Sequence, residues 1–491
     1  MSKPTTATEL CDLTATEARR LIGTKEISPV ELVESCIQRV EAVDGAVNCM
    51  VTRAYDRARE EAKVAEEMVM EGDDLGLLHG LPVGIKDLEA TEGVRTTWGS
   101  LINKDTVPDA DQGSVAAVRA EGAIILGKTN TPEFGAGANT KNRVFGATGN
   151  PFNSELTCAG SSGGSAVALA TGMVPIASGS DYGGSLRTPA GFCGVVGFRP
   201  SPGVVPAENK APALMPWSQL GPMARTVEDA HLMLQAQADD DRADPFSGAV
   251  DLRLFGSVDG LDLGSIRAAL TPDLGCCPVD QGIRDTFDAR AKQFRGVFAE
   301  DQDRDPGFDE AMAGSGGDIH RLFEIFRGIT FVGAHQERLA KHRDLLGPNV
   351  IDNTDRGLEI TASDVGWGLV QQAKIMRHFI DMFEEVDVLI CPAASVSPFP
   401  HEQLYVEEIN GEKMPTYMRW LAISYVPTMA LACSAVIPCG VDHKGMPFGI
   451  QVMAPNGSDA LVLAVAHALE QYFAGKADLE RPVPDLNKLK G

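Results

Sequence analysis

The chain has 491 residues, enough for about three domains or for one unusually large α/β domain. Hydrophobic residues make up 44% of the chain and charged residues 23%, a composition that excludes a disordered, collagen-like or coiled-coil protein. The net charge of −25 repels phosphate backbones and anionic lipids, which argues against nucleic acid and membrane surfaces as partners and leaves small neutral or cationic molecules open.

Nothing in the sequence marks the chain for export or for a membrane. Residues 1–10 contain no apolar stretch and no cleavage site. An apolar stretch such as 166–177 is shorter than the roughly 20 residues that span a bilayer. The ten cysteines are scattered without a CxxC pair and are expected to be small buried apolar side chains. We therefore expect a cytoplasmic protein.

Helices are predicted throughout residues 9–72. Ser28, Pro29 and Glu31 stand in the order of an N-cap, a first helical residue and the partner of a capping box. The apolar residues that follow at helical spacing predict one buried face, formed by Leu32, Val33, Cys36, Ile37, Val40 and Val43. A further, mostly charged helix is expected over residues 54–70.

The pattern then changes to that of an α/β core. Short apolar runs punctuated by glycine, from residue 76 to 205, are typical of buried strands that alternate with helices. Residues 238–320 are acidic and weakly periodic, which favours an irregular, variable region rather than core. Helices are expected again over 319–385, followed by three strand-like runs and a last helix at residues 386–393, 430–438, 448–454 and 459–473.

These patterns predict one large α/β domain whose strands come from both ends of the chain. Its four expected parts are an N-terminal helical segment that packs on the core, the glycine-rich core itself, a variable substrate-side insertion and a C-terminal part that completes the core, at residues 1–75, 76–235, 236–385 and 386–491.

Two motif matches are set aside. Residues 122–129 fit the P-loop pattern GxxxxGK[ST], but a phosphate-binding loop follows a strand, and these residues are themselves predicted to be a strand ending in a turn. Residues 301–305 resemble a calcium loop, but Pro306 stands where the turn glycine belongs and Met312 where the bidentate glutamate belongs. A solvated acidic loop is expected there instead.

The glycine-rich segment 159–201 is the most informative part of the sequence. Ten glycines lie between residues 160 and 197, and glycine allows backbone N–H groups to approach a reacting oxygen closely. Three hydroxyls, those of Ser161, Ser162 and Ser185, lie among them. The segment is therefore a candidate site for a serine nucleophile.

Residues 160–164 also match the GxSxG nucleophile elbow, but the sequence that enters them is loop-like. None of the nine histidines has a site-like context, and His467, on an apolar helix, is expected to be a core or surface residue. Without a histidine, a lysine can act as the base if burial lowers its pKa from about 10.4 toward about 7 to 8. Lys86 directly follows an apolar run and is the candidate, with a solvated surface lysine as the alternative.

The combination of these features resembles the amidase signature family. Its hallmark is matched almost throughout by GSSGGSAVALATG and GSDYGGSLRTPAGFCGVVGFRP, at residues 160–172 and 179–200. Further family features are LPVGIKD around Lys86, GKTNTPEFGAGANTKNRVFGATGNP, GPMARTVEDA and PFGIQVMAP. The resemblance implies a single domain with a central mixed β-sheet flanked by helices and an inserted variable helical region.

The resemblance also implies a Ser-cisSer-Lys triad that needs no metal and no cofactor. Ser185 would be the nucleophile, Ser161, after a cis peptide bond, the bridging residue, and Lys86 the base. The backbone N–H groups of four residues would stabilise the oxyanion, namely Tyr182, Gly183, Gly184 and Ser185. Three further residues would support the loop, namely Ser162, Asp181 and Arg187.

By this resemblance the chain is an amidase that hydrolyses a carboxylic amide to the acid and ammonia or amine. The alternative is the glutaminase subunit of a tRNA-dependent amidotransferase, which shares the fold. Those subunits usually read DTGGSIRQP where this chain has Tyr182 and Thr188, and GYYDAYY where it has the sequence of residues 364–383. Both departures favour a stand-alone enzyme.

The substrate itself is not named by the sequence. The predicted substrate contacts are Gly135, Gly137 and Trp217. Further candidates for the acyl pocket are Tyr182, Met215 and Trp367. For the aromatic residues and Met215, the alternative is that they pack in the core. The expected partner is a small-molecule amide, without nucleic acid or membrane, and a homodimer is left open.

Overall fold

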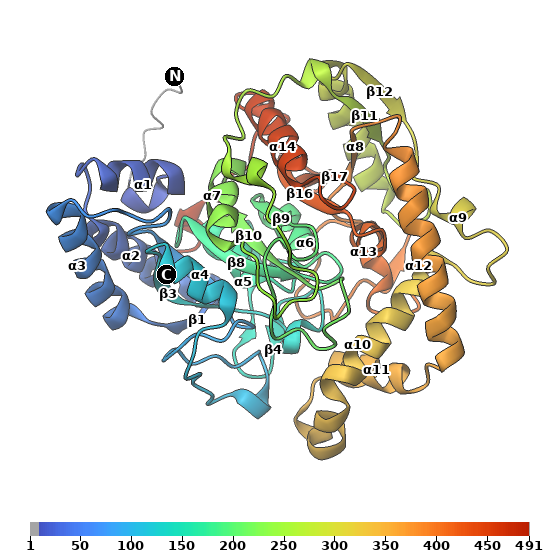
Figure 1. The fold of residues 1–491 in the computed structure, drawn as a ribbon, viewed down its shortest axis with the longest axis horizontal. Coiled ribbons are helices and arrows are strands. Elements are labelled where there is room, and N and C mark those ends of the chain that lie inside the picture. Colours follow the sequence, from blue (N-terminus) through green and yellow to red (C-terminus); the bar gives the residue numbers. More distant parts are fainter. Residues whose placement is uncertain (1–8, 491) are drawn as a thin grey trace.

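A computed structural model describes residues 9–490 and shows one central β-sheet with helices on both sides (Figure 1). Residues 1–8, part of the segment without a visible secretory signal, lie outside the described range. The sheet has 11 strands in the order β1 (Met50–Arg53), β3 (Ile124–Thr129), β2 (Pro82–Lys86), β8 (Ile176–Asp181), β10 (Gln219–Ala224), β9 (Val196–Arg199), β16 (Cys433–Val441), β17 (Pro447–Ala454), β13 (Val388–Pro392), β11 (Arg267–Leu270) and β12 (Glu300–Asp303).

The sheet is mixed, as predicted. Strand β2 is parallel to both β3 and β8, whereas β10, β9, β16 and β17 pair antiparallel. Because β9 pairs with β16, strands from the two ends of the chain meet in the middle of one sheet. The expectation of a single large domain is therefore confirmed, while the boundaries of its four predicted parts stay a prediction.

The N-terminal helices α1 (Ala15–Gly23), α2 (Pro29–Val47) and α3 (Tyr55–Glu71) confirm the helical prediction. Ser28 caps α2, and the Glu31 side chain returns to the Ser28 N–H, which completes the capping box. All six apolar residues predicted for the inner face of α2 are buried. The sequence did not indicate the short strand β1, which lies between α2 and α3 and pairs with β3.

The region 238–320 is less irregular than predicted. Strands β11 and β12 belong to the central sheet, α8 (Gln281–Phe294) lies between them, and Ala268, Ala269 and Leu270 are buried. The prediction that this region lies outside the core is wrong for 267–303. Neither strand carries a strong pattern, because β11 has only four residues and β12 is an exposed edge strand of sequence EDQD.

The helices expected over 319–385 are α10 (Ile319–His342), α11 (Pro348–Leu358) and α12 (Ala362–Met382), which lie beside one another on the right of Figure 1. The last helix, α14 (Asp459–Phe473), has the predicted bounds. The remaining elements are α4 (Gly113–Ala120), β4 (Lys141–Asn142), β5 (Gly146–Ala147), β6 (Gly149–Asn150), β7 (Asn153–Thr157), α5 (Gly163–Ala170), α6 (Arg187–Cys193), α7 (Val227–Gln237), α9 (Phe308–Ala311), β14 (Glu408–Ile409), β15 (Glu412–Lys413) and α13 (Ala422–Met429). No helix within residues 9–490 combines the length and apolar character that a membrane crossing requires.

Candidate active site

Lys86 is the last residue of β2 and is fully buried, as the apolar run before it predicted. Its Nζ lies 2.8 Å from the hydroxyl oxygens of both Ser161 and Ser162, and 2.9 Å from that of Ser180. Burial lowers the pKa of Lys86 to about 7, although the charges of Glu89 and Asp181 favour the ammonium form. The alternative of a solvated surface lysine is excluded.

Ser161 reaches the amine from the turn before α5. The peptide bond between Gly160 and Ser161 is cis, as the family resemblance implies. Gly135 borders the same hydroxyl, because a Cβ on Gly135 would lie 3.4 Å from Ser161 Oγ. Ser161 itself is 2% exposed, so the contact between Lys86 and Ser161 is shielded from water.

Ser185 lies in the turn that follows β8 and is more exposed than Ser161. The two serine segments are held together by the backbone, because the Ser162 N–H donates to the Ser185 carbonyl at 3.2 Å. The Ser185 hydroxyl makes no hydrogen bond with any residue in 9–490. The structure therefore joins Lys86 to Ser161 directly, and a backbone hydrogen bond joins the segment of Ser162 to that of Ser185.

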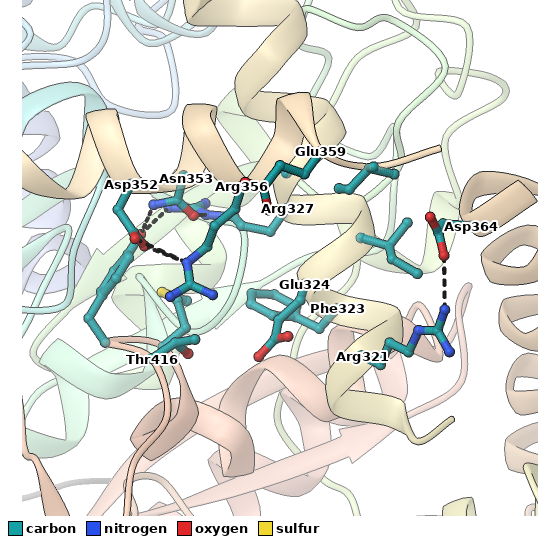
Figure 2. A pocket seen from close by; sticks show the side chains of 15 residues that line it. Arg321, Phe323, Glu324, Arg327, Asp352, Asn353, Arg356, Glu359, Asp364 and Thr416 are labelled. Atoms are coloured by element: carbon teal, nitrogen blue, oxygen red, sulfur yellow. Dashed lines mark hydrogen bonds and ion pairs between the residues drawn. The ribbon is translucent and has the colours of Figure 1, made fainter. Parts of the chain in front are cut away.

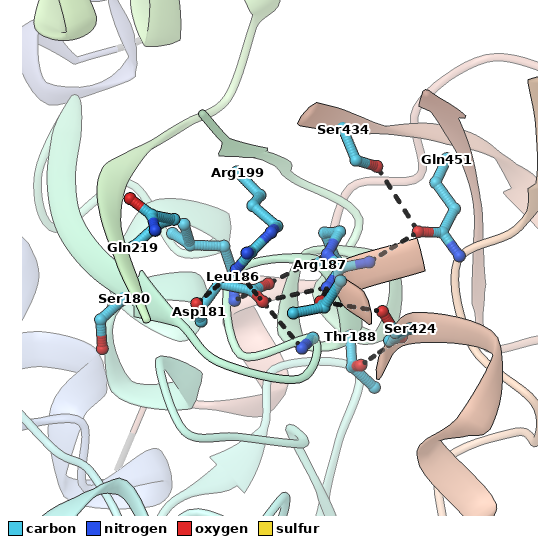
Figure 3. A network of polar contacts seen from close by, with 12 residues as sticks. Ser180, Asp181, Leu186, Arg187, Thr188, Arg199, Gln219, Ser424, Ser434 and Gln451 are labelled. Atoms are coloured by element: carbon cyan, nitrogen blue, oxygen red, sulfur yellow. Dashed lines mark hydrogen bonds and ion pairs between the residues drawn. The ribbon is translucent and has the colours of Figure 1, made fainter. Parts of the chain in front are cut away.

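Asp181 organises the turn that carries Ser185 (Figure 3). One carboxylate oxygen accepts from the Gly184 N–H at 2.9 Å, from Arg187 at 3.0 Å and from Arg199 at 3.1 Å. The other oxygen accepts from the Leu186 N–H and from Arg187 Nε. Both guanidinium groups hold the pKa of the buried carboxyl well below its usual range. Asp181 and Arg187 thus support the turn, and Arg199 is a third member that the sequence did not indicate.

The same contacts correct one of the predicted oxyanion donors. The Gly184 N–H is already engaged by Asp181, so it fastens the turn. The backbone N–H groups of Tyr182, Gly183 and Ser185 have no acceptor among the described residues. Gly183 lies against two aromatic side chains, since a Cβ there would lie 3.2 Å from Tyr425 Cβ and 3.3 Å from Phe323 Cζ.

The other predicted substrate residues have packing or hydrogen-bond partners of their own. Trp217 is 2% exposed and stacks on Phe326 with 4.1 Å between ring centroids, an arrangement that favours core packing. Gly137 faces Asn349 of α11. Met215 is half-buried against the core, and the Trp367 indole donates to the carbonyl of Ser315.

A cavity of about 270 Å³ lies between α10, α11 and residues 416–418 (Figure 2). Its charged side chains are largely paired with one another, as Arg321 is with Asp364 and Arg356 with Asp352. None of the three predicted triad residues lines it. The cavity therefore does not contain the predicted catalytic centre.

The sequence motifs that were set aside do not form binding loops. Residues 124–129 are strand β3 to their last residue, so the predicted strand is confirmed and the predicted turn is wrong. Residues 301–303 belong to edge strand β12, which makes the predicted acidic loop only partly correct. In the part of the chain that the structure describes, no group of three or more histidine, cysteine or acidic side chains could hold a metal ion.

Comparison with known proteins identifies the family. The sequence matches the amidase family over residues 31–296 and 360–463. The chain belongs to the amidase signature family, whose members hydrolyse amides. It is 34% identical to a glutamyl-tRNA(Gln) amidotransferase subunit of Geotalea daltonii, covering 94% of this chain and 98% of that protein, and 30% identical to an acylamidase of Rhodococcus erythropolis, covering 93% and 95%. A bacterial aryl acylamidase of this family superposes with a TM-score of 0.86 at 29% identity, covering 94% of this chain and 96% of that one.

Sequence reasoning missed several polar residues around Lys86. Ser180 donates or accepts at Lys86 Nζ, and Ser178, Glu89 and Lys128 lie buried behind it. Ser178 and Ser180 lie in β8, within the glycine-rich segment itself, whereas Glu89 and Lys128 are distant from that segment in sequence. Only the polar residues within otherwise apolar strands, such as SGSD in β8, could have signalled them.

Asp181→Asn should destabilise the protein by about 3–5 kcal/mol, because two buried guanidinium groups would lose their carboxylate. Asp352→Asn, which breaks the exposed pair with Arg356, should cost at most about 1 kcal/mol. Chemical denaturation of both variants measures the difference. Equal stability of the two variants would contradict a structural role for Asp181.

Proposed function

We propose that this protein is a stand-alone amidase that hydrolyses a carboxylic amide through an acyl-enzyme on Ser185. The observation that carries the proposal is the 2.8 Å contact between the buried Lys86 amine and the Ser161 hydroxyl, on a segment that a backbone hydrogen bond ties to Ser185. A lysine with a pKa near 7 is largely neutral just above neutral pH and can then accept a proton. No histidine is needed for this step.

The acylation step moves two protons, one from Ser185 to Ser161 and one from Ser161 to Lys86. Neutral Lys86 takes the proton of Ser161, Ser161 takes the proton of Ser185, and Ser185 Oγ attacks the amide carbonyl carbon. The carbonyl oxygen becomes an oxyanion, which accepts hydrogen bonds from the unengaged N–H groups of Tyr182, Gly183 and Ser185.

Collapse of this intermediate breaks the carbon–nitrogen bond. The leaving nitrogen takes a proton back along the same hydroxyls and departs as ammonia or amine. Water then gives a proton to the same chain and attacks the acyl carbon, which releases the acid and restores Ser185.

The second candidate function is the glutaminase subunit of a tRNA-dependent amidotransferase. The 34% identity to the amidotransferase subunit from Geotalea daltonii favours it. Tyr182 and Thr188, which replace the residues usual in those subunits, favour the stand-alone amidase. In this chain the Tyr182 ring packs against Phe323 and Arg327, and the Thr188 hydroxyl lies 3.2 Å from that of Ser424.

Ammonia release from the purified chain alone decides between the two functions. The panel contains aliphatic, aromatic and dicarboxylic amides together with free glutamine. A stand-alone amidase turns over a simple amide without any partner. Activity confined to glutamine, and only in the presence of partner subunits, would favour the amidotransferase function.

Ser185→Ala should leave a folded protein whose amide hydrolysis is lower by several orders of magnitude, since the members of a triad act as a unit. Steady-state kinetics measures the loss. Peptide mapping after reaction with a fluorophosphonate should place the adduct on Ser185. Retention of more than a tenth of the activity, or an adduct on Ser162, would overturn the assignment of the nucleophile.

The activity should rise with pH through a limb near 7 and level off above it. Burial lowers the pKa of Lys86 to about 7, and only the neutral amine accepts the proton of Ser161. Lys86→Arg should be as damaging as Lys86→Ala, because a guanidinium stays protonated at any working pH. The test measures kcat/KM as a function of pH for the wild-type protein, Lys86→Arg and Lys86→Ala. If Lys86→Arg keeps most of kcat, Lys86 is a hydrogen-bond donor and not the base.

A further inference from the structure

A second group of buried charges lies behind Lys86, and the mechanism above uses none of them. Glu89 is 1% exposed, and Asp87 and Lys128 are fully buried. Asp87 and Glu89 belong to the turn that follows β2, and Lys128 lies in the neighbouring strand β3. A charge without water around it acts strongly on its neighbours, so the group can influence the catalytic lysine.

Glu89 is tied to Lys86 through both the backbone and a hydroxyl. The Glu89 N–H donates to the Lys86 carbonyl at 3.0 Å. The Ser178 hydroxyl donates to the Glu89 carboxylate and accepts the Lys86 backbone N–H at 3.0 Å. On its far side the carboxylate accepts the Ser114 hydroxyl at 2.7 Å. These contacts fix the position of the negative charge relative to the lysine.

Lys128 contacts the turn that carries Glu89 from the neighbouring strand. Its ammonium donates to the Glu89 carbonyl and, at 2.7 Å, to the Thr91 hydroxyl. The charge of Lys128 lowers the pKa of both Asp87 and Glu89, opposing the desolvation that raises them. Together with the hydroxyls of Ser178 and Ser114, Lys128 therefore favours the ionised form of Glu89 against the burial that disfavours it.

The charges that face Lys86 come from two elements. Glu89 lies in the turn after β2, and Asp181 lies at the end of β8. The Asp181 carboxylate is engaged by Arg187 and Arg199, which offset its charge. Glu89 has hydroxyl donors on its carboxylate and one ammonium nearby, so it is the less neutralised of the two acids.

We propose that Glu89 is a positioning residue for the amidase reaction, which sets how readily Lys86 takes up the proton of Ser161 and is itself kept charged by Lys128. The inference rests on the proposed function of Lys86. Desolvation alone would make the amine a weak base, and a base that is too weak accepts a proton poorly even though it is always neutral. The Glu89 charge restores part of its basicity.

The test compares the acid limb of kcat/KM against pH in charge variants of the two residues. Glu89→Gln removes the negative charge at constant shape and should move the limb to lower pH by about one unit, with a lower plateau. Lys128→Gln removes the cation that favours the charged form of Glu89 and should move the limb in the same direction by a smaller amount. Ser114→Ala removes a hydroxyl that also favours the charged form of Glu89 and should shift the limb slightly in the same direction. Glu385→Gln, which removes an exposed carboxylate paired with Arg304, is the matched control and should leave the limb in place.

Shifts to lower pH in both charge variants, larger in Glu89→Gln, support the proposal, since a merely structural role would lower the plateau without moving the limb. An unmoved limb in Glu89→Gln, or a shift to higher pH in either variant, would overturn it. Ser178→Ala, which weakens the link between Glu89 and Lys86, should shift the limb in the direction of Glu89→Gln by a smaller amount. If Glu89→Gln does not fold, the shift of the limb in Ser178→Ala tests the role of Glu89 instead.

The pH profile of the wild-type enzyme distinguishes a failure of this inference from a failure of the proposed function. A wild-type enzyme that hydrolyses amides with an acid limb, combined with an unmoved limb in the variants, contradicts only the role of Glu89. A wild-type chain without amide hydrolysis, or without a limb, contradicts the role of Lys86 and with it both proposals.

Discussion

The removal of water from around Lys86 is the constraint on which the rest of the site depends. In water a lysine side chain is protonated at neutral pH and cannot accept a proton. Strand β2 lies between β3 and β8 and carries Lys86 out of water at its end. The three hydroxyls around Nζ replace the lost water, and they serve the neutral amine as well as the ammonium, because a hydroxyl both donates and accepts.

The topology of the sheet explains why the polar residues meet at one place. Strands β3, β2 and β8 are parallel neighbours, and their carboxyl ends lie at the same edge of the sheet. Lys86 and Asp181 are the last residues of β2 and β8. The turn after β8 carries Ser185, and the turn before α5 brings Ser161 to the same edge. The antiparallel strands beyond β8 complete the core and do not contribute to the lysine.

The sequence indicated most of the fold and the three central residues, because they carry local signals. Strong apolar runs predicted β2, β3 and β8, and the glycine-rich motif singled out Ser161 and Ser185. Strands β11 and β12 were missed because four residues, or four exposed polar ones, leave no periodic pattern. Glu89 was missed for a different reason: its partners come from β3, β8 and α4, and no spacing along one segment reveals such a group.

Lys86 and Lys128 are both fully buried, yet the groups around them favour different chemical roles. Besides the Thr91 hydroxyl, Lys128 faces a backbone carbonyl oxygen, which only accepts hydrogen bonds, and three carboxylates favour its ammonium form. Burial lowers its pKa only to about 8. Lys86 faces hydroxyls, any of which can turn a proton toward a neutral amine. The acceptors around a buried lysine, more than its burial, therefore decide whether it holds a proton as a structural cation or passes one on as a base.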